Sequence, residues 1–332
     1  MAAISTMIKP KYSAIYEDYW RLAAERQNIF FKRLNGHRYP WTDDEIFIKY
    51  KFTNSYRASD RVSQYLISNV IYKGHANDID TIFRIILFKI FNKIETWELL
   101  NAELNAISIE TFNYGAYDKV LTHALNSGKR IYSAAYMMPS GSSVFNTTRK
   151  HQAHLKLLEI IVRKRIPELV QQSSSMEEGY NILLSLPMIG RFLAYQYITD
   201  INYSEAINFS EMSFVMPGPG ALSGISKFFT SLGDYSPADA IKLMADMQEI
   251  EFERLGIDFK NLWGRRLQLI DCQNLFCEFD KYCRVKHPDV VGVSKRKKIK
   301  QLYKESKTAL KPWYPPKWGI NSAIYPEGHV NV

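Results

Sequence analysis

The feature that most constrains the fold of this chain is the regular recurrence of helix start and stop signals. Helix-forming sequence from 14 to 34 ends at Asn35-Gly36, and Thr42-Asp-Asp-Glu45 then has the form of a capping box. Glycine (16) and proline (13) make about 9% of the chain, below the ~12% of average proteins. Further helix starts are predicted at Asn77, Ser174-Ser175 and Ser236-Pro237. The pattern predicts an all-α fold.

The length of 332 residues suits one large domain or two modest ones. The hydrophobic share of 46% and the charged share of 23% are those of a folded globular protein. The sequence changes character where KRKKIK (295–300) is followed by the turn-rich KPWYPPKWG. We therefore expect a helical domain over 1–290 and a basic C-terminal extension over 291–332, which is either solvated or bound along a phosphate backbone.

The chain is basic, with 43 Lys+Arg, 34 Asp+Glu and a net charge of +9. Such a surplus favours a polyanionic partner, because cationic side chains neutralise phosphates and release counterions. The most apolar stretch, Phe83 to Phe91, contains Arg84 and Lys89 and is far shorter than the ~20 residues of a membrane span, so we interpret it as a buried helix. The first twenty residues have no secretory signal pattern. We expect a cytoplasmic monomer with no membrane partner.

The most informative segment is 184–200, LSLPMIGRFLAYQYITD. One helix is predicted to end before a tight turn over Met188, Ile189 and Gly190, and a second helix begins at Arg191. Backbone N–H groups point outward at such a helix start, and glycine lets a phosphate come close. The turn therefore predicts an anion site, with an ordinary helix-loop-helix corner as the alternative.

The turn sequence LPMIGRFLA resembles the hairpin of the helix-hairpin-helix DNA glycosylases, usually written L-P-G-[VI]-G-x-x-[TS]-A. Met188 stands in place of the first glycine, which leaves the turn less conformational freedom. The resemblance implies that Met188, Ile189, Gly190 and Arg191 bind DNA. It implies no cofactor, apart from a monovalent cation that the hairpin could hold.

Other segments extend the resemblance in the same order along the chain. They are similar to a helical family of bacteria and phages that comprises the α-glutamyl/putrescinyl-thymine pyrophosphorylases and the helical domain of hydroxymethyluracil DNA kinases. Its members include phage-defence DNA glycosylases that remove glucosylated hydroxymethylcytosine. The resemblance covers roughly 25–290 and implies an all-α, two-lobed helix-hairpin-helix DNA glycosylase-like fold. The segments are WTDDEIF, IFIKYKFTNSYRASDRVSQY (46–65), KIET, SEMSFVMPGPGALSGISK and LIDCQNLFCEFDKYCR.

The resemblance also implies where a base extruded from the duplex would bind. In the segment like 46–65, the helix-hairpin-helix glycosylases carry a polar residue into the duplex three positions before an aspartate, and here these residues are Arg57 and Asp60. Aromatic residues, 14% of the chain, can provide a stacking pocket, although core packing is the alternative for each of them. The substrate-binding candidates are Trp41, Phe52, Asn54, Tyr56, Arg57, Asp60 and Tyr136.

Glycosidic cleavage builds positive charge on the sugar and requires a carboxylate near it. The helix-hairpin-helix glycosylases place an aspartate about twenty residues after the final hairpin glycine, where this chain has Ser210 followed by Glu211. Glu211 is the first catalytic candidate and Asp200 the second, with a surface charge or a helix cap as the alternative. Bifunctional relatives have a Schiff-base lysine at the position of Phe192, so the resemblance implies a monofunctional hydrolase.

The segment GPGALSGISK superficially suggests a phosphate loop. It fails the known patterns because Gly224 is separated from Lys227 and because Ser223 takes the place of a glycine. We expect instead a helix start that brings Gly218, Gly220 and Lys227 close to DNA or to the catalytic acid. The alternative is a plain loop-to-helix junction.

The cysteines Cys272, Cys277 and Cys283 have the spacing C-x4-C-x5-C. These positions do not share one face of a helix, so no metal site is expected. Reduced and mostly buried thiols fit a cytosolic protein.

The leading hypothesis is a monofunctional DNA glycosylase for antiviral defence. It would excise a hydroxymethylated or glucosylated pyrimidine from double-stranded phage DNA and leave an abasic site. One alternative is a transferase that displaces pyrophosphate from an activated hydroxymethyl-pyrimidine in DNA. Another is a DNA-binding module without catalytic activity.

Overall fold

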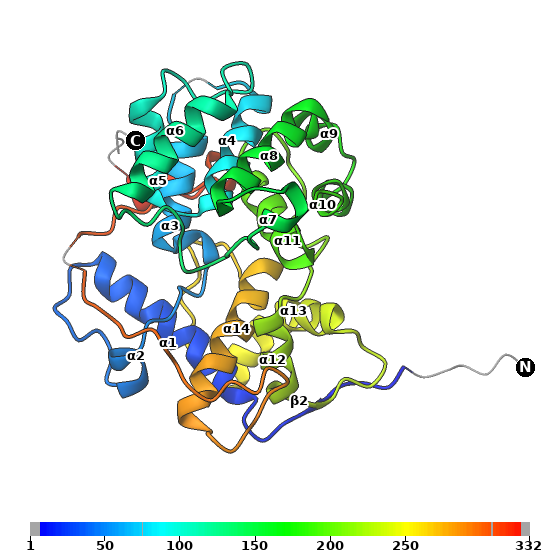
Figure 1. The fold of residues 1–332 in the computed structure, drawn as a ribbon. Helices are drawn as coiled ribbons and strands as arrows, with labels where there is room; N and C mark the ends of the chain where they lie inside the picture. The colour runs from blue at the N-terminus through cyan, green and yellow to red at the C-terminus, as the bar shows by residue number, and fades with distance from the viewer. Residues whose placement is uncertain (1–6, 75, 307, 327–332) are drawn as a thin grey trace, which may run out of the picture. The chain divides into compact units, whose positions relative to one another are not determined.

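The structure, a computed structural model, describes residues 7–74, 76–306 and 308–326 (Figure 1). The expected helical class is confirmed, because most elements are helices. The longer ones are α1 (Glu17–Leu34), α4 (Asp78–Phe91), α5 (Ile94–Glu103), α6 (Tyr114–Asn126), α8 (Lys150–Arg163), α10 (Met176–Leu184), α11 (Arg191–Ile201), α12 (Pro219–Phe228), α13 (Pro237–Arg254) and α14 (Leu269–Lys286). The shorter ones are α2 (Glu45–Lys49), α3 (Arg61–Tyr65), α7 (Ser142–Phe145), α9 (Ile166–Gln171), α15 (Asn321–Ile324), the 3-10 turns Arg57–Ser59 and Pro316–Trp318, and a π-helix at Leu66–Ile71. A small antiparallel sheet pairs β1 (Lys11–Tyr12) with β2 (Phe229–Ser231).

The described residues divide into two compact units. Unit 1 comprises residues 7–60, 214–312 and 322–326, and unit 2 comprises residues 61–213 and 313–321. Unit 1 is therefore built from segments that are far apart in the sequence.

Unit 1 is organised around α14, which contacts α1, α12 and α13. Its core is aromatic: the rings of Tyr19, Phe228 and Phe276 lie within 6 Å of one another, centroid to centroid. The closest helix contact joins α12 to α14. A Cβ at Gly220 would lie 2.9 Å from Cys277 Sγ, and one at Gly224 would lie 2.0 Å from the carbonyl oxygen of Phe276. Two glycines four residues apart thus let the helix backbones meet.

Unit 2 is organised around α4, which contacts the π-helix, α9 and α11. The apolar stretch Phe83 to Phe91 lies in this helix and is buried apart from the half-buried Arg84, as the sequence predicts. No helix in the described part of the chain has both the length and the apolar character needed to cross a bilayer.

Local signals predicted most helix ends correctly. Asn77 caps α4 by accepting the Asp80 N–H, and Ser175 caps α10 by accepting the Glu178 N–H. Ser236 forms a capping box with Asp239 in α13. At α2 the predicted Thr42–Glu45 capping box is wrong: the cap is Asp44, and Thr42, two residues earlier, accepts the Asp44 N–H.

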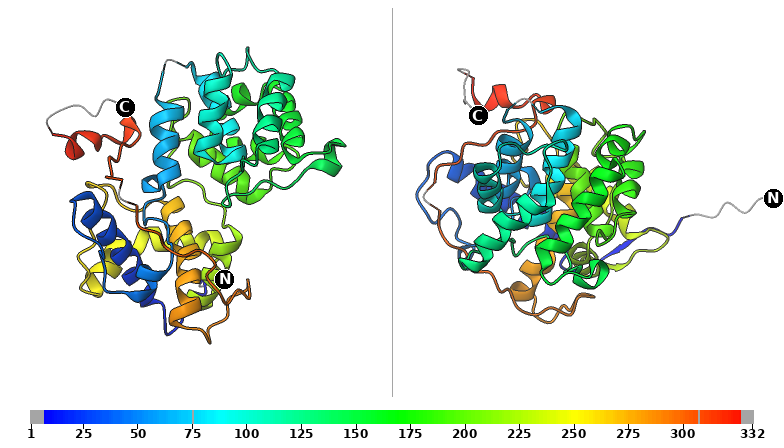
Figure 2. Two further views of the ribbon diagram at one scale, coloured as in Figure 1. Left: turned by 60° about the vertical axis from the view of Figure 1, so that its left-hand side comes forward. Right: turned by 45° about the horizontal axis from the view of Figure 1, so that its top comes forward.

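The basic extension is bound to the units along much of its length. We call residues 291–303 the basic strap; it follows α14 in unit 1 (Figure 2). Farther on, residues 313–321 belong to unit 2, where the Trp313 N–H donates to Gln64 Oε1 at 2.8 Å. Residues 307 and 327–332 of the expected extension, and residues 1–6 of the expected signal-free start, lie outside the described residues.

We expect Gly224→Ala to lower the free energy of unfolding by about 2–4 kcal/mol, because the added carbon would push α12 away from α14. Gly190→Ala is the matched control: nothing lies within 4 Å of its added carbon, so its effect should stay within about 1 kcal/mol. Urea denaturation followed by circular dichroism measures both. A Gly224→Ala protein as stable as the wild type would contradict this contact.

Candidate functional site

The residues predicted from sequence are divided between the two units. Unit 1 holds Trp41, Phe52, Asn54, Tyr56, Arg57, Asp60, Gly218, Gly220 and Lys227. Unit 2 holds Tyr136, Met188, Ile189, Gly190, Arg191, Asp200 and Glu211. Each unit thus has its own group of candidates.

In unit 1, a polar group that we call the Asp60 cluster joins the segment 53–60 to α1 and α14. The Asn54 N–H donates to Asp60 Oδ1 at 2.8 Å, and Arg26 Nη2 donates to Asn54 Oδ1 at 2.9 Å. Glu278 Oε2 accepts the Thr53 N–H at 3.0 Å. Sequence analysis predicted Asn54 and Asp60 but missed their partners Arg26 and Glu278. The full cluster is Arg26, Thr53, Asn54, Asp60, Asn274 and Glu278.

The Asp60 cluster shifts the ionisation of its central carboxyl group. Burial raises the pKa of Asp60 to about 6, and the Glu278 carboxylate adds to the rise, while the Asn54 N–H and Arg26 oppose it. A carboxyl group that titrates close to neutral pH can accept or donate a proton during a reaction. Asp60 is therefore the strongest candidate for acid–base chemistry in unit 1.

Trp41 and Phe52, both predicted to bind the base, line one small cavity. Each faces a cation: the Arg33 guanidinium lies 5.0 Å from the Trp41 ring and the Lys281 ammonium 4.4 Å from the Phe52 ring. The cavity has a volume of about 30 Å³, room for little more than water, so a base does not fit in it as it stands. Tyr56 lies outside this cavity and is buried, and its hydroxyl donates to the Arg265 carbonyl at 2.6 Å.

A larger cavity of about 450 Å³, within the size range of ligand sites, lies on the other side of Phe47 in unit 1. Sequence analysis missed this cavity. Its signal is the helical spacing of the α1 residues that line it. Tyr282 contributes from α14, donating its hydroxyl to Asp44 Oδ2 at 2.6 Å. The polar lining is Asp18, Arg21, Glu25, Asn28, Thr42, Asp43, Asp44, Tyr282 and Lys286.

One wall of the larger cavity is an ion-paired carboxylate. Asp18 accepts from Lys286 at 2.8 Å and from His287 at 2.6 Å. Burial alone would raise the pKa of Asp18, but these two hydrogen bonds outweigh it and the pKa is lowered. Asp18 therefore stays ionised at neutral pH.

Arg57 was expected to project into the duplex as a wedge. Its side chain is only 1% exposed, and its backbone N–H donates to Asp271 Oδ1 at 2.8 Å. This placement corrects the expectation, because an inserting side chain must extend from the protein surface.

The hairpin of unit 2 has the predicted form, with α10 ending at Leu184 and α11 beginning at Arg191. Met188 takes the left-handed conformation (φ +66°) where glycine is usual, and its Sδ lies 1.8 Å from the position that a Cβ on Gly141 would occupy. Gly190 and Arg191 are exposed, whereas Ile189 is buried. Gly190 precedes the helix without a side-chain cap, so the first N–H groups of α11 lack that partner. The cation at this turn stays a prediction.

The second predicted acid, Asp200, is buried and forms an ion pair with Lys89, 3.0 Å from Nζ to Oδ2. The same ammonium lies 4.5 Å from the ring of Tyr136, which stacks on Phe192. The structure thus brings Asp200 and Tyr136 into one group around Lys89. Glu211 lies in a turn after α11 and is partly exposed.

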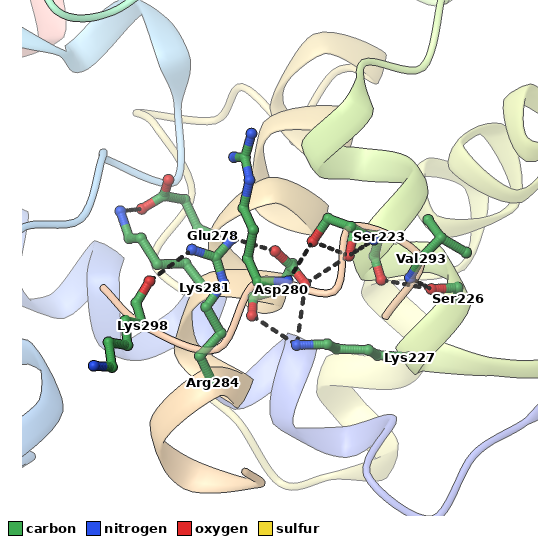
Figure 3. A network of polar contacts seen from close by, with 11 residues as sticks. Ser223, Ser226, Lys227, Glu278, Asp280, Lys281, Arg284, Val293 and Lys298 are labelled. Carbon is green, nitrogen blue, oxygen red and sulfur yellow. Dashed lines mark hydrogen bonds and ion pairs between the residues drawn. The ribbon is translucent and has the colours of Figure 1, made fainter. Parts of the chain in front are cut away.

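Lys227 was expected to contact DNA, and the structure corrects this. It is 2% exposed, and its Nζ lies 3.0 Å from Asp280 Oδ1 (Figure 3). Gly220 packs α12 on α14 and Gly218 is a buried residue before α12, so the loop-to-helix junction describes this segment better than a DNA contact does.

The cysteines lie on α14, where Cys272 and Cys283 are buried and Cys277 is partly buried. Burial raises the pKa of each thiol, to about 12 for Cys277 and Cys283. Among the described residues, no group of three or more His, Cys, Asp or Glu side chains is arranged to hold a metal ion.

We predict that Asp60→Asn changes how stability depends on pH. The folded pKa of about 6 lies above the ordinary value of 3.8, so ionisation of Asp60 costs stability as pH rises from about 4 to 6. The variant should therefore gain on the order of 2–3 kcal/mol relative to wild type between pH 4 and pH 7. Asp43→Asn, at an exposed position, is the control. Parallel pH curves for wild type and Asp60→Asn in urea denaturation would contradict the raised pKa.

Comparison with known proteins finds a curated relative. It is the 5-hmdU DNA kinase of Bacillus phage SP10, 27% identical over 289 residues. The match covers 81% of this chain and 45% of the relative, so the chain spans about half the length of that kinase. No solved structure matches.

The relative overturns the leading hypothesis from sequence. It is named as a kinase, which transfers a group to DNA, whereas a glycosylase hydrolyses the N-glycosidic bond. The expectation of a DNA N-glycosylase that leaves an abasic site is therefore wrong, and the defence role attached to that activity falls with it. The resemblance was right about the family, and the glycosylase activity that it implied is wrong.

A second comparison shows the family. Residues 13–292, most of the chain, match the family described as "5-hmdU DNA kinase, helical domain". This region runs from before α1 to beyond α14 and contains both the Asp60 cluster and the hairpin. The chain therefore belongs to the family of 5-hmdU DNA kinase helical domains.

Proposed function

We propose that this chain recognises a hydroxymethylated pyrimidine in double-stranded DNA and serves a transferase reaction at that base. The observation that carries the proposal is the family match over residues 13–292, which contains every candidate residue of both units. The curated relative is named for a base of this kind in DNA. The net charge of +9 supports a DNA partner, since cationic side chains neutralise phosphates.

The α10–α11 hairpin supports contact with the DNA backbone. Its exposed Gly190 leaves room for a phosphate beside the N–H groups that begin α11, and Arg191 adds a positive charge next to them. This is the helix-hairpin-helix interpretation of the turn. In this interpretation the hairpin binds the DNA backbone, and this binding is independent of the reaction at the base.

We favour a role of the chain in recognition of the base over a role in binding the phosphoryl donor. The segment GPGALSGISK, the candidate for binding a donor, is used for packing. Gly220 and Gly224 serve the contact between α12 and α14, and Lys227 is paired with Asp280. None of these groups is then available to surround a nucleotide phosphate, as a phosphate loop must.

We expect the chain to bind a duplex with one 5-hydroxymethyluracil about tenfold more tightly than the same duplex with thymine. The added hydroxyl offers a donor and an acceptor, and one such contact is worth ~1–3 kcal/mol of discrimination. Fluorescence anisotropy with two labelled duplexes that differ only at this base measures the ratio. Equal affinities would reject recognition of the modified base.

A second candidate function, direct participation in the transfer step, is favoured by the pKa of Asp60 near 6. When the hydroxymethyl oxygen receives a phosphoryl group, a new O–P bond replaces the bond to the donor's leaving oxygen. The hydroxyl proton must then pass to a base, and Asp60 is suited to accept it at neutral pH.

We expect Asp60→Asn to lower the rate of transfer by about 100-fold while changing the affinity for modified DNA less than about twofold. The assay incubates the chain with modified DNA and ATP and identifies the nucleosides by mass. Asp246→Asn, at an exposed position of α13 outside both cavities, is the control. Undiminished transfer by Asp60→Asn, or an equal loss in both variants, would exclude Asp60 as the base.

A further inference from the structure

The basic strap (residues 291–303) carries five exposed cations within the six residues 295–300. The sequence has no acidic residue between Asp289 and Glu305. Within the described residues, no ion pair involves the side chains of the exposed strap cations. These cations are Lys295, Arg296, Lys297, Lys298 and Lys300. They are thus available to an anionic partner.

The start of the strap is fixed to α12 by hydrogen bonds (Figure 3). The Val293 N–H donates to Ser226 Oγ at 3.1 Å, and the Ser294 N–H donates to Ser223 Oγ at 3.3 Å. Gly292 is needed here because a Cβ would lie 2.4 Å from Ser223 Oγ and 2.8 Å from its carbonyl oxygen. The strap therefore meets α12 at backbone distance.

A buried charge network holds this attachment. The Ser223 hydroxyl donates to Asp280 Oδ1 at 2.8 Å, and Lys227 and Arg284 both pair with the same carboxylate. Burial would raise the pKa of Asp280, but the hydrogen bonds from Arg284, Ser223 and Lys227 outweigh it and lower the pKa. Asp280 therefore remains ionised at neutral pH. Arg284 also donates to the carbonyl of Lys298 at 3.2 Å and so fixes the middle of the strap.

The end of the strap is paired with the last residue of α2 and the segment that follows it. The Lys51 N–H donates to the Gln301 carbonyl at 3.1 Å, and the Tyr303 N–H donates to the Lys49 carbonyl at 3.0 Å. Lys49 and Lys51 are also exposed, so the pairing adds two cations to the same surface. The cationic side chains thus project from a backbone that is held at its start, middle and end.

We infer that the basic strap is a binding surface for the phosphate backbone of double-stranded DNA. This inference rests on the proposed function and adds the element that supplies affinity independent of base identity. A series of cations on a fixed backbone releases counterions with little further loss of conformational entropy. An anionic membrane is the competing partner for a basic segment. A membrane surface favours an amphipathic helix with aromatic side chains, whereas the cationic stretch 295–300 is not helical and contains no aromatic residue.

The test replaces three strap cations in K297Q/K298Q/K300Q. The matched control K119Q/R163Q/K164Q removes the same charge from exposed positions of unit 2. Dissociation constants are measured by anisotropy from 50 to 200 mM NaCl, with the thymine and the 5-hydroxymethyluracil duplexes. We expect the strap variant to bind both duplexes at least about tenfold more weakly at low salt. The slope of the logarithm of the binding constant against the logarithm of the salt concentration should become less steep by about 0.9 for each phosphate that the variant no longer neutralises.

Three results would overturn the inference. They are unchanged affinity and slope in the strap variant, an equal loss in the control, or a loss seen only on vesicles of phosphatidylserine and phosphatidylcholine. The proposed function fails differently. If the wild type binds both duplexes equally while the strap variant weakens both, base recognition is rejected and the strap remains a backbone-binding surface.

Ser223→Ala tests whether the fixed geometry matters, because it keeps every cation and removes the hydroxyl that links the strap to Asp280. We expect DNA affinity to fall several-fold and trypsin to cut the strap faster, with Ser223→Thr restoring both. Wild-type affinity in Ser223→Ala together with faster cleavage would show that order in the strap is not needed and would overturn that part of the inference.

Discussion

The contact between α12 and α14 is the constraint on which the rest of unit 1 depends. Gly224 lies against the backbone of Phe276, and one turn farther along α14 the carboxylate of Asp280 lies buried between Lys227 and Arg284. Once α14 is held in this way, its remaining faces have defined neighbours. Asn274 and Glu278 face the segment 53–60, and Tyr282 and Lys286, four residues apart, face the larger cavity with α1. A single helix therefore positions the Asp60 cluster, the cavity and the basic strap.

The buried charges of the two units differ in how well they are compensated. Asp280 has two cations and a hydroxyl around it, and Asp200 has Lys89 within 3.0 Å, so desolvation is offset by close opposite charge. The Asn54 N–H and Arg26 stabilise the ionised form of Asp60, but burial and the Glu278 carboxylate outweigh them, and the pKa of Asp60 is raised. A carboxyl group whose charge is only partly compensated is a candidate for a functional role, because shifted pKa values cluster at functional sites.

Features encoded over a few residues were predictable, and features that depend on a distant partner were not. Caps at Asn77, Ser175 and Ser236, the buried helix from 83 to 91 and the turn at Gly190 are local patterns, and each was found from sequence. The glycines of GPGALSGISK were assigned to DNA because nothing near them in the sequence indicates α14, about fifty residues away. For the same reason, the sequence around Lys227 did not indicate that this lysine is buried beside Asp280 of α14. The Asp60 cluster was half predicted, because Arg26 and Glu278 come from other helices.

The error about chemistry has a physical origin as well. Gripping a DNA backbone requires outward N–H groups and cations, and these are the same whether a glycosidic bond is cut or a hydroxyl is modified. The hairpin turn that carried the resemblance therefore specified the partner more strongly than the reaction. What separates the two reactions is the group next to the reacting atom: a carboxylate beside the sugar carbon for hydrolysis, a base beside the hydroxymethyl oxygen for transfer. In this chain the exposed cations of the basic strap and the titratable carboxyl of Asp60 belong to different parts of unit 1. The proposed roles in backbone affinity and in action on the base can therefore be tested by separate substitutions.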